Sequence, residues 1–167
     1  ANAVTAEGEA ITVTVNKDVD AVYDKVKNFI KQYNELLEEM NKLYNADSAK
    51  GYDILTDEER EAMTEEQIEK WENKIKDSLL RRDDNLGSLL NTMKTTVSKC
   101  ISVNGKGYAL SSFGIVTSEY TEKGKLHLLG DEEDTYGKDY ADKLKAALSE
   151  DADTVMKVLS GVAKELY

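Results

Sequence analysis

The sequence contains little of the chemistry on which enzymes and metal proteins depend. Its 167 residues include one cysteine, Cys100, and one histidine, His127. A single cysteine excludes an internal disulfide, so stability must come from packing, and we expect Cys100 to be a small buried hydrophobe on a helical stripe. A single histidine excludes metal sites that need a histidine pair. Because Leu126 and Leu128 flank it in a strand-like run, His127 is expected to face solvent rather than act in catalysis.

Long apolar runs and basic clusters are also missing. No run approaches the ~20 apolar residues that a membrane span requires, and the first eight residues lack a secretory signal. The chain has 33 acidic against 22 basic side chains, and its largest basic cluster is Arg81-Arg82, which excludes a typical nucleic-acid binder. It begins without methionine, and the helical pattern at 155–166 continues to the last residues, so we expect a fragment of a longer protein.

Motifs that could hold a ligand do not fit their templates. Gly105 and Gly107 share the spacing of a dinucleotide-binding loop, but Leu110 stands where that loop needs glycine or alanine. The acidic run at 131–134 does not match an EF-hand, because the residue at the twelfth loop position is Lys143 instead of glutamate. The sequence therefore predicts a turn and a loop at these places, and no enzyme, catalytic residue, metal or cofactor.

The most specific stretch is the one at 55–90, which contains two helix start signals in series. Thr56 with Glu59, and Thr64 with Gln67, have the spacing of capping boxes. A helix is predicted over 67–80 with one apolar face that can be buried; its members are Ile68, Trp71, Ile75 and Leu79. A second helix is predicted after a charged corner at 81–84, with a stripe formed by Leu86, Leu90, Met93, Val97 and Cys100.

A long helix is predicted from Asp18 or Asp20 to about Tyr44. Its apolar residues alternate steps of three and four, which is the pattern of a heptad seam; they stand at positions 19, 22, 26, 29, 33, 36, 40 and 43. Such a seam needs a facing helix. Two interpretations remain open, namely a helix of an intramolecular bundle and a seam between subunits.

The remaining segments complete a mainly α fold, a helical bundle with one small antiparallel β-hairpin and a short N-terminal strand. The strand is predicted at 10–15, and the hairpin at 114–129, with strands at 114–120 and 125–129 joined by a four-residue connection at 121–124. Two closing helices are predicted at 138–148 and 152–166, the second capped by Asp151 or Asp153. The length suits one domain.

Three segments together resemble one bacterial protein family. They read DVDAVYDKVKNFIKQYNELLEEM, then LTDEEREAMTEEQIEKWENKIKDSLLRRDD, and finally LSSFGIVTSEYTEKGKLHL followed by KLKAALSEDADTVMKVL. In this order and spacing they are similar to the C-terminal region of the flagellar filament-capping family, also called hook-associated protein 2. The resemblance covers about residues 11–159. It implies that residues 1–17 are a strand and linker from a missing head region, and that 18–167 form a helical domain.

The resemblance also implies a structural function without chemistry. The family caps the distal tip of the extracellular flagellar filament, assists the insertion of flagellin and leaves the cell through the flagellar export channel. The implied partners are further copies of itself, flagellin, hook–filament junction proteins and an export chaperone. Two alternatives remain: a surface adhesion module that binds through the loops at 45–54 and 131–137, and a generic helical scaffold.

Overall fold

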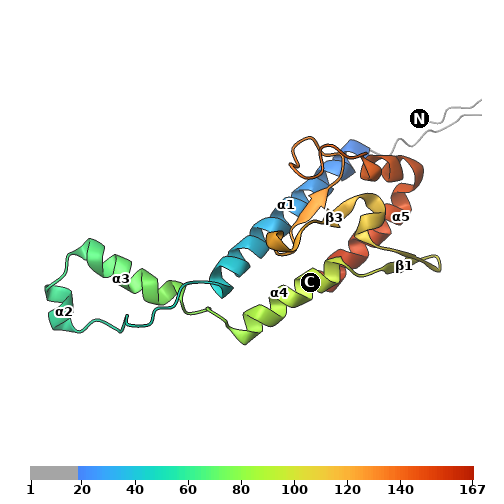
Figure 1. The fold of residues 1–167 in the computed structure, drawn as a ribbon. Helices are drawn as coiled ribbons and strands as arrows, with labels where there is room; N and C mark the ends of the chain where they lie inside the picture. Colours follow the sequence, from blue (N-terminus) through green and yellow to red (C-terminus); the bar gives the residue numbers. More distant parts are fainter. Residues whose placement is uncertain (1–18) are drawn as a thin grey trace, which may run out of the picture.

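The computed structural model describes residues 19–167, and this part of the chain is mainly helical (Figure 1). Within it lie five α-helices and two small antiparallel sheets of two strands each. The prediction of a mainly α fold is confirmed, although the described residues form two hairpins where one was expected. The strand predicted at 10–15 and the linker at 1–17 lie outside the described residues.

The long helix α1, Val19–Tyr44, buries a heptad seam inside the chain. The buried apolar residues are Val26, Ile30, Tyr33, Leu37 and Met40, so the helix serves an intramolecular core. The predicted seam had the correct period but included Leu36, whose side chain is 54% exposed. The structure buries its neighbour Leu37 instead, which is only 1% exposed. The reason is that the strand β4 and the helices α4 and α5 pack on the side of α1 that carries Leu37.

The helix α4, Asp84–Val97, begins at its cap Asp83 and ends before the predicted stripe does. Leu90, Met93 and Val97 are buried as expected. The prediction for Cys100 is wrong, because this residue is exposed. The helix ends at Val97, and the chain enters the strand β1, Ile101–Val103, so the helical period no longer applies at position 100.

Two hairpins follow α4 in the chain. In the first, β1 pairs with β2, Lys106–Tyr108, across a turn in which Asn104 and Gly105 have φ values of 53° and 80°. Two positive φ values suit the tight turns that join paired strands. The second hairpin joins β3, Ile115–Thr117, to β4, Leu126–Leu128, as predicted. Its predicted four-residue connection is wrong, because the strands are shorter and the 3-10 turn η2, Tyr120–Glu122, lies between them.

The chain closes with α5, Lys143–Leu166, which consists of two helical stretches joined at a kink. Asp142 caps the first stretch, and Asp151 interrupts the helix with φ −147° and ψ 76°. The Asp151 carboxylate accepts a hydrogen bond from the Thr154 amide at 3.1 Å, so it caps the second stretch. The two predicted closing helices are confirmed with Asp151 as the cap, but the first begins at residue 143 instead of 138.

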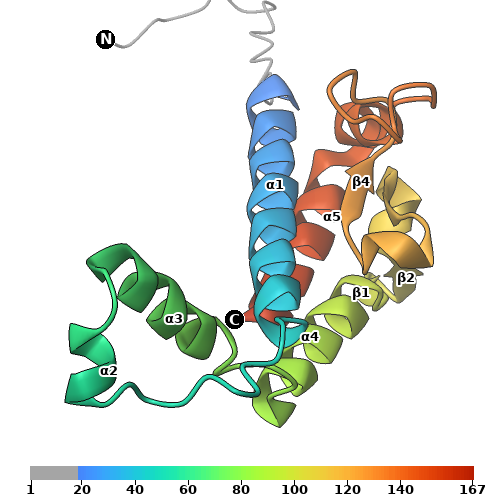
Figure 2. The ribbon, with the colours of Figure 1, turned by 60° about the vertical axis from the view of Figure 1, so that its left-hand side comes forward.

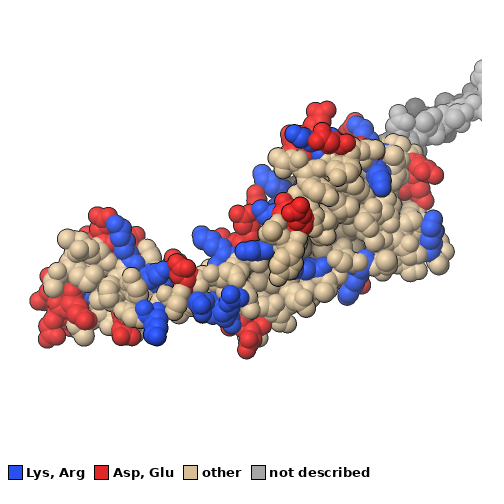
Figure 3. Space-filling view, viewed as in Figure 1, with Lys and Arg blue, Asp and Glu red and all other residues tan. Residues whose placement is uncertain are grey.

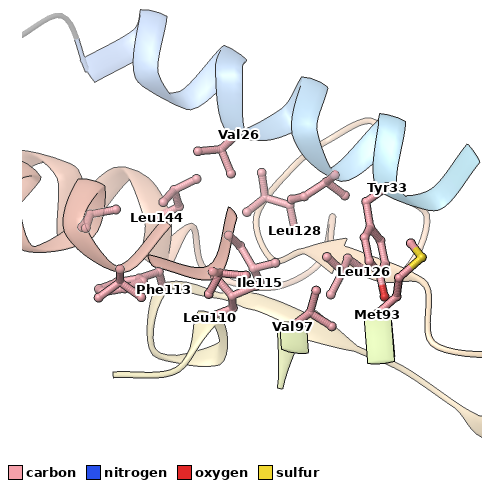
Figure 4. Packing of buried hydrophobic residues seen from close by; sticks show 14 of the residues in the cluster. Val26, Tyr33, Met93, Val97, Leu110, Phe113, Ile115, Leu126, Leu128 and Leu144 are labelled. Atoms are coloured by element: carbon pink, nitrogen blue, oxygen red, sulfur yellow. The ribbon is translucent and has the colours of Figure 1, made fainter. Parts of the chain in front are cut away.

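One hydrophobic core joins these elements, and we call the part of the chain that builds it, residues 19–44 and 84–167, the body. Figure 4 shows Val26 and Tyr33 of α1 directed toward the second hairpin and the 3-10 turn η1, Leu110–Phe113. Leu144 and Val158 of α5 are fully buried in the same core. Full burial of such a side chain contributes roughly 1.5–3 kcal/mol. The body is therefore stabilised by packing among α1, α4, α5 and β4.

Residues 45–83 leave the body between α1 and α4, and we call them the arm (Figures 1 and 2). The arm contains α2, Asp57–Glu61, and α3, Glu65–Asp77. Neither helix has a buried residue, and both lie away from the core. The arm is thus the part of the described chain most open to another molecule.

Candidate interaction surfaces

The arm is held in shape by local signals that the sequence predicted. Both capping boxes are formed: the Thr56 hydroxyl accepts from the Glu59 amide, and the Thr64 hydroxyl accepts from the Gln67 amide. In return, the Glu59 and Gln67 side chains accept from the two cap amides at 2.8 and 2.9 Å. These bonds satisfy amides that the first turn of a helix otherwise leaves without partners. They fix where α2 and α3 begin, without help from the body.

Contacts within the arm join α3 to the chain on both sides of α2. The Trp71 ring lies 4.6 Å from the Tyr52 ring, and its indole Nε1 donates to the Asp53 carbonyl at 2.8 Å. Two ion pairs connect segments far apart in the arm: Arg60 pairs with Glu72, and Lys74 contacts Asp47 at 3.1 Å. Exposed ion pairs contribute little stability, so the aromatic contact has the greater weight.

The two ends of the arm meet where it joins the body. The Arg82 amide donates to the Tyr44 carbonyl at 3.0 Å, and the Arg82 guanidinium lies 5.1 Å from the centre of the Tyr44 ring. Arg82 adopts a positive φ of 57°, which turns the chain toward α4. The last residue of α1 is therefore adjacent to the chain that enters α4, and the arm is an insertion between two elements of the body.

The apolar face predicted for α3 exists, but the body does not cover it. Ile68, Trp71 and Ile75 are only half-buried, and Leu79 is 72% exposed. Ile54, which precedes α2, is 87% exposed. The amphipathic pattern correctly identified the apolar side that can be buried, and in the described chain only the segment before α2 lies against it. Apolar side chains in this position form a surface that is available for contact with another molecule.

A second candidate surface is a groove on the body between α1 and α5. It has a cavity volume of about 210 Å³ and an almost wholly apolar lining, which includes Val22, Phe29, Leu110, Met156 and Leu159. Among residues 19–167, Lys25 is the only charged residue that lines it. Its chemistry suits an apolar side chain better than a polar ligand.

The structure places His127 in a buried polar cluster, so the prediction that it faces solvent is wrong. His127 is 8% exposed, and its Nδ1 and Nε2 atoms lie 2.9 Å from an Asp134 oxygen and 2.8 Å from a Glu122 oxygen. Alternating burial along β4 predicted an exposed His127, but both sides of the strand are covered: Leu126 and Leu128 are buried on one side, and the loop after β4 covers the other. Both ring nitrogens are engaged by carboxylates, which leaves neither of them free to serve as a catalytic base.

Asp134 organises the loop that covers His127. Burial opposes its charge, but the hydrogen bonds from His127 and from the Leu128, Gly137 and Tyr136 amides hold the pKa of the Asp134 carboxyl below its ordinary value. The same loop is tied to α1, because Lys27 Nζ contacts Asp131 at 2.9 Å and Glu133 at 2.8 Å. The cluster thus fastens three segments together, and its geometry fits a structural function.

The glycines and acidic residues that do not match a ligand-binding motif lie in a turn, a strand and a loop. Gly105 lies in the turn of the first hairpin, as predicted, whereas Gly107 lies in strand β2. The acidic run at 131–134 belongs to the loop just described. Among residues 19–167, no group of three or more histidine, cysteine or acidic side chains is placed to hold a metal ion. Over the same residues, no helix has the length and apolar character that crossing a membrane demands.

Comparison with known proteins places these surfaces in a family context. The family model for the flagellar hook-associated protein 2 C-terminus matches residues 2–166. The chain is 35% identical over 153 residues to flagellar hook-associated protein 2 of Halalkalibacterium halodurans, covering 91% of this chain and 27% of that protein. It is 30% identical over 157 residues to the protein of the same name from Thermotoga maritima, covering 92% and 22%. The chain thus spans about a quarter of the length of these relatives. No solved structure matches it.

Proposed function

Because the chain belongs to the flagellar hook-associated protein 2 family, we propose that it is part of the cap at the distal tip of the bacterial flagellar filament. The family match over residues 2–166 is the observation that carries this proposal. The cap would assemble from several copies of the whole protein and promote the addition of flagellin subunits at the tip. Its action is mechanical: it holds a shape and makes or breaks no bond.

The proposed setting determines its partners. The whole protein leaves the cell through the flagellar export system and acts outside it, in contact with other copies of itself and with flagellin. Hook–filament junction proteins and an export chaperone are further proposed partners. Within the whole protein, residues 1–17 would connect the helical domain of residues 18–167 to a head region.

The described structure supports a mechanical function through its division into body and arm. A body with one packed core provides a rigid base, and the arm projects from it with exposed apolar and charged side chains. The cluster around His127 fastens loops together and leaves neither ring nitrogen available for chemistry. A subunit that contacts neighbours through a projecting element needs these properties and no catalytic site.

Deletion of the whole gene tests the proposal. We expect the strain to secrete flagellin monomers into the medium, to carry short or missing filaments and to lose swimming, with recovery when the gene is returned. A returned gene in which residues 46–81 are replaced by a short glycine and serine linker tests the arm, because Arg82 and Tyr44 already lie side by side. Normal filament length and swimming in the full deletion strain would refute the cap function.

Adhesion through exposed loops is the alternative, and the same strain tests it. The loop at 131–137 is held by Lys27 and Asp134, whereas the loop at 45–54 ends in the exposed Ile54. Adhesion as the main function predicts a strain that swims normally with normal filaments but attaches poorly to surfaces. Loss of swimming together with loss of filaments would assign the primary function to capping.

A further inference from the structure

The arm carries its charges in two separate halves. Residues 57–69, the acidic half, contain seven carboxylates and one arginine, and residues 70–82, the basic half, contain five basic and two acidic side chains. Nearly all of these side chains are exposed. Figure 3 shows acidic side chains gathered at the outer end of the arm and basic ones toward the body. The arm therefore presents opposite charges at its two ends.

Most of the acidic charge is not neutralised by other residues of the part that the structure describes. Arg60 pairs with Glu72, and Glu66 pairs with Lys70 at 2.7 Å, but the other carboxylates of the acidic half form no ion pair in the described residues; they are Asp57, Glu58, Glu59, Glu61, Glu65 and Glu69. In the basic half, Lys76, Arg81 and Arg82 likewise form none within residues 19–167. Each half thus has charge available for a partner of the opposite sign.

The two halves are far enough apart to act as separate binding elements. Their centres are about thirteen residues apart in the chain, which along a helix corresponds to ~20 Å. Charges in water are screened over about 8 Å at physiological ionic strength. A partner that contacts one half is therefore little affected by the other. The chain as a whole has a net charge of −11, so two copies repel unless opposite halves meet.

Exposed apolar residues lie at both ends of the arm. Ile54 is at the outer end beside α2, and Leu79 and Leu80 are at the inner end after α3. Contact between the outer end of one arm and the inner end of another would bring apolar side chains from both copies into the same interface. Charge then sets the register, while burial of these residues supplies the affinity.

We propose that the arm is a self-association element, in which the acidic half of one copy binds the basic half of the arm of the next copy. Each arm then uses its two halves with two different neighbours. Such a head-to-tail contact produces a closed ring when the rotation between copies closes. The inference rests on the proposed assembly of copies into a cap, and it names the surface through which adjacent copies meet.

Charge-reversing substitutions in either half of the arm test the proposed contact, because each variant should associate in one defined way. The acid-reversed variant carries Glu58→Lys, Glu61→Lys and Glu69→Lys, and the base-reversed variant carries Lys76→Glu and Arg81→Glu. The side chains of these five residues form no ion pair and no cap hydrogen bond within residues 19–167. Trp71 fluorescence and circular dichroism verify that each variant is folded.

Sedimentation of the whole 167-residue chain at low salt, up to about millimolar concentration, measures the association. We expect the parent chain to exceed the mass of a dimer as concentration rises, and either variant alone to weaken the association at least about tenfold. An equal mixture of the two variants retains one unchanged contact, between the basic half of the first and the acidic half of the second, whereas the two altered halves have net charges of 0 and −1 and attract each other little. The mixture should therefore stop at a heterodimer.

A matched control separates arm charge from net charge. The variant Glu39→Lys, Glu132→Lys and Glu150→Lys changes the net charge of the body as much as the acid-reversed variant changes that of the arm. It should associate at least as well as the parent. Arm variants that associate like the parent, a parent that stays monomeric or stops at a dimer, or a mixture that fails to pair would overturn the inference. The deletion strain tests the cap function separately, so the two can fail independently.

Discussion

The body and the arm contain helices with the same amphipathic spacing, but only the helices of the body bury apolar residues. In α1 the seam from Val26 to Met40 packs against other elements of the body. In α3 the corresponding face has no buried residue. The difference shows that a periodic pattern identifies the apolar side of a helix, whereas burial depends on whether another element of the same chain covers that side. A face left open is available to another molecule.

The largest effect should come from two adjacent leucines of α1. Leu37→Ala removes a side chain that is 1% exposed, and we expect the free energy of unfolding to fall by about 2–5 kcal/mol because a cavity remains. Leu36→Ala removes a side chain that is 54% exposed and should change the free energy by less than about 0.5 kcal/mol. Urea unfolding followed by circular dichroism compares the two. Equal losses would contradict the observed seam.

A somewhat smaller loss is expected for Asp134→Ala in the body. The change removes the carboxylate that accepts hydrogen bonds from the Leu128, Tyr136 and Gly137 amides and contacts His127. Donors left without a partner should lower the free energy of unfolding by about 1–3 kcal/mol. The control is Glu132→Ala in the same loop, an exposed residue whose removal should have little effect. A harmless Asp134→Ala would show that the loop does not depend on this carboxylate.

The depressed pKa of Asp134 predicts the direction of a pH effect on the body. The folded state holds this pKa below the ordinary value of about 4, so below that pH the unfolded chain binds the proton more readily. The stabilisation by Asp134 is therefore complete above about pH 4 and is lost as the pH falls through the lowered folded pKa. Urea midpoints measured from pH 6 downward should show a flatter decline in Asp134→Ala than in the parent.

Removing a helix cap from the arm should lower the local stability of that helix by about 1 kcal/mol. Thr64→Ala removes the hydroxyl that accepts from the Gln67 amide. Because α3 is not packed on the core, amide hydrogen exchange should accelerate in α3 while the unfolding midpoint of the body stays the same. Asp142→Ala removes the matching cap of α5 and should lower that midpoint. A lower midpoint in Thr64→Ala would mean that the arm and the body unfold together.

The smallest effect on stability is expected for Leu79→Ala at the inner end of the arm. Its side chain is 72% exposed, so the free energy of unfolding should change by less than about 0.5 kcal/mol. Sedimentation of the same variant should nevertheless show weaker self-association, since this side chain belongs to the proposed interface. A clear loss of stability would show that Leu79 supports the fold of the arm instead.

Local signals in the sequence predicted local structure well. Both capping boxes formed at the predicted residues, and Asp151 caps the last helical stretch, because these signals involve atoms only three residues apart. The pairing of β3 with β4 was also predicted from strand-like runs on either side of a turn. The first hairpin was predicted only as a turn, since its three-residue strands are too short to show a period.

Features that depend on distant partners could not be read from the sequence. Leu36 and Leu37 are equally apolar, and only the packing of β4 and α4 on one side of α1 determines which one is buried. His127 looked exposed because alternation assumes one open face, whereas the loop that carries Asp134 covers that face. The open surface of the arm is the reverse case, in which an amphipathic helix is covered only by the short segment before α2.

The positions of Trp71 and Cys100 have a practical consequence for measuring how the arm moves. Trp71 is the only tryptophan and lies in the arm, while Cys100 is the only cysteine and lies exposed on the body. A dye attached to the thiol would accept energy from the indole without any change of sequence. Transfer efficiency would then report the separation of arm and body in the free chain, and its shift on assembly would show whether the arm changes its position relative to the body.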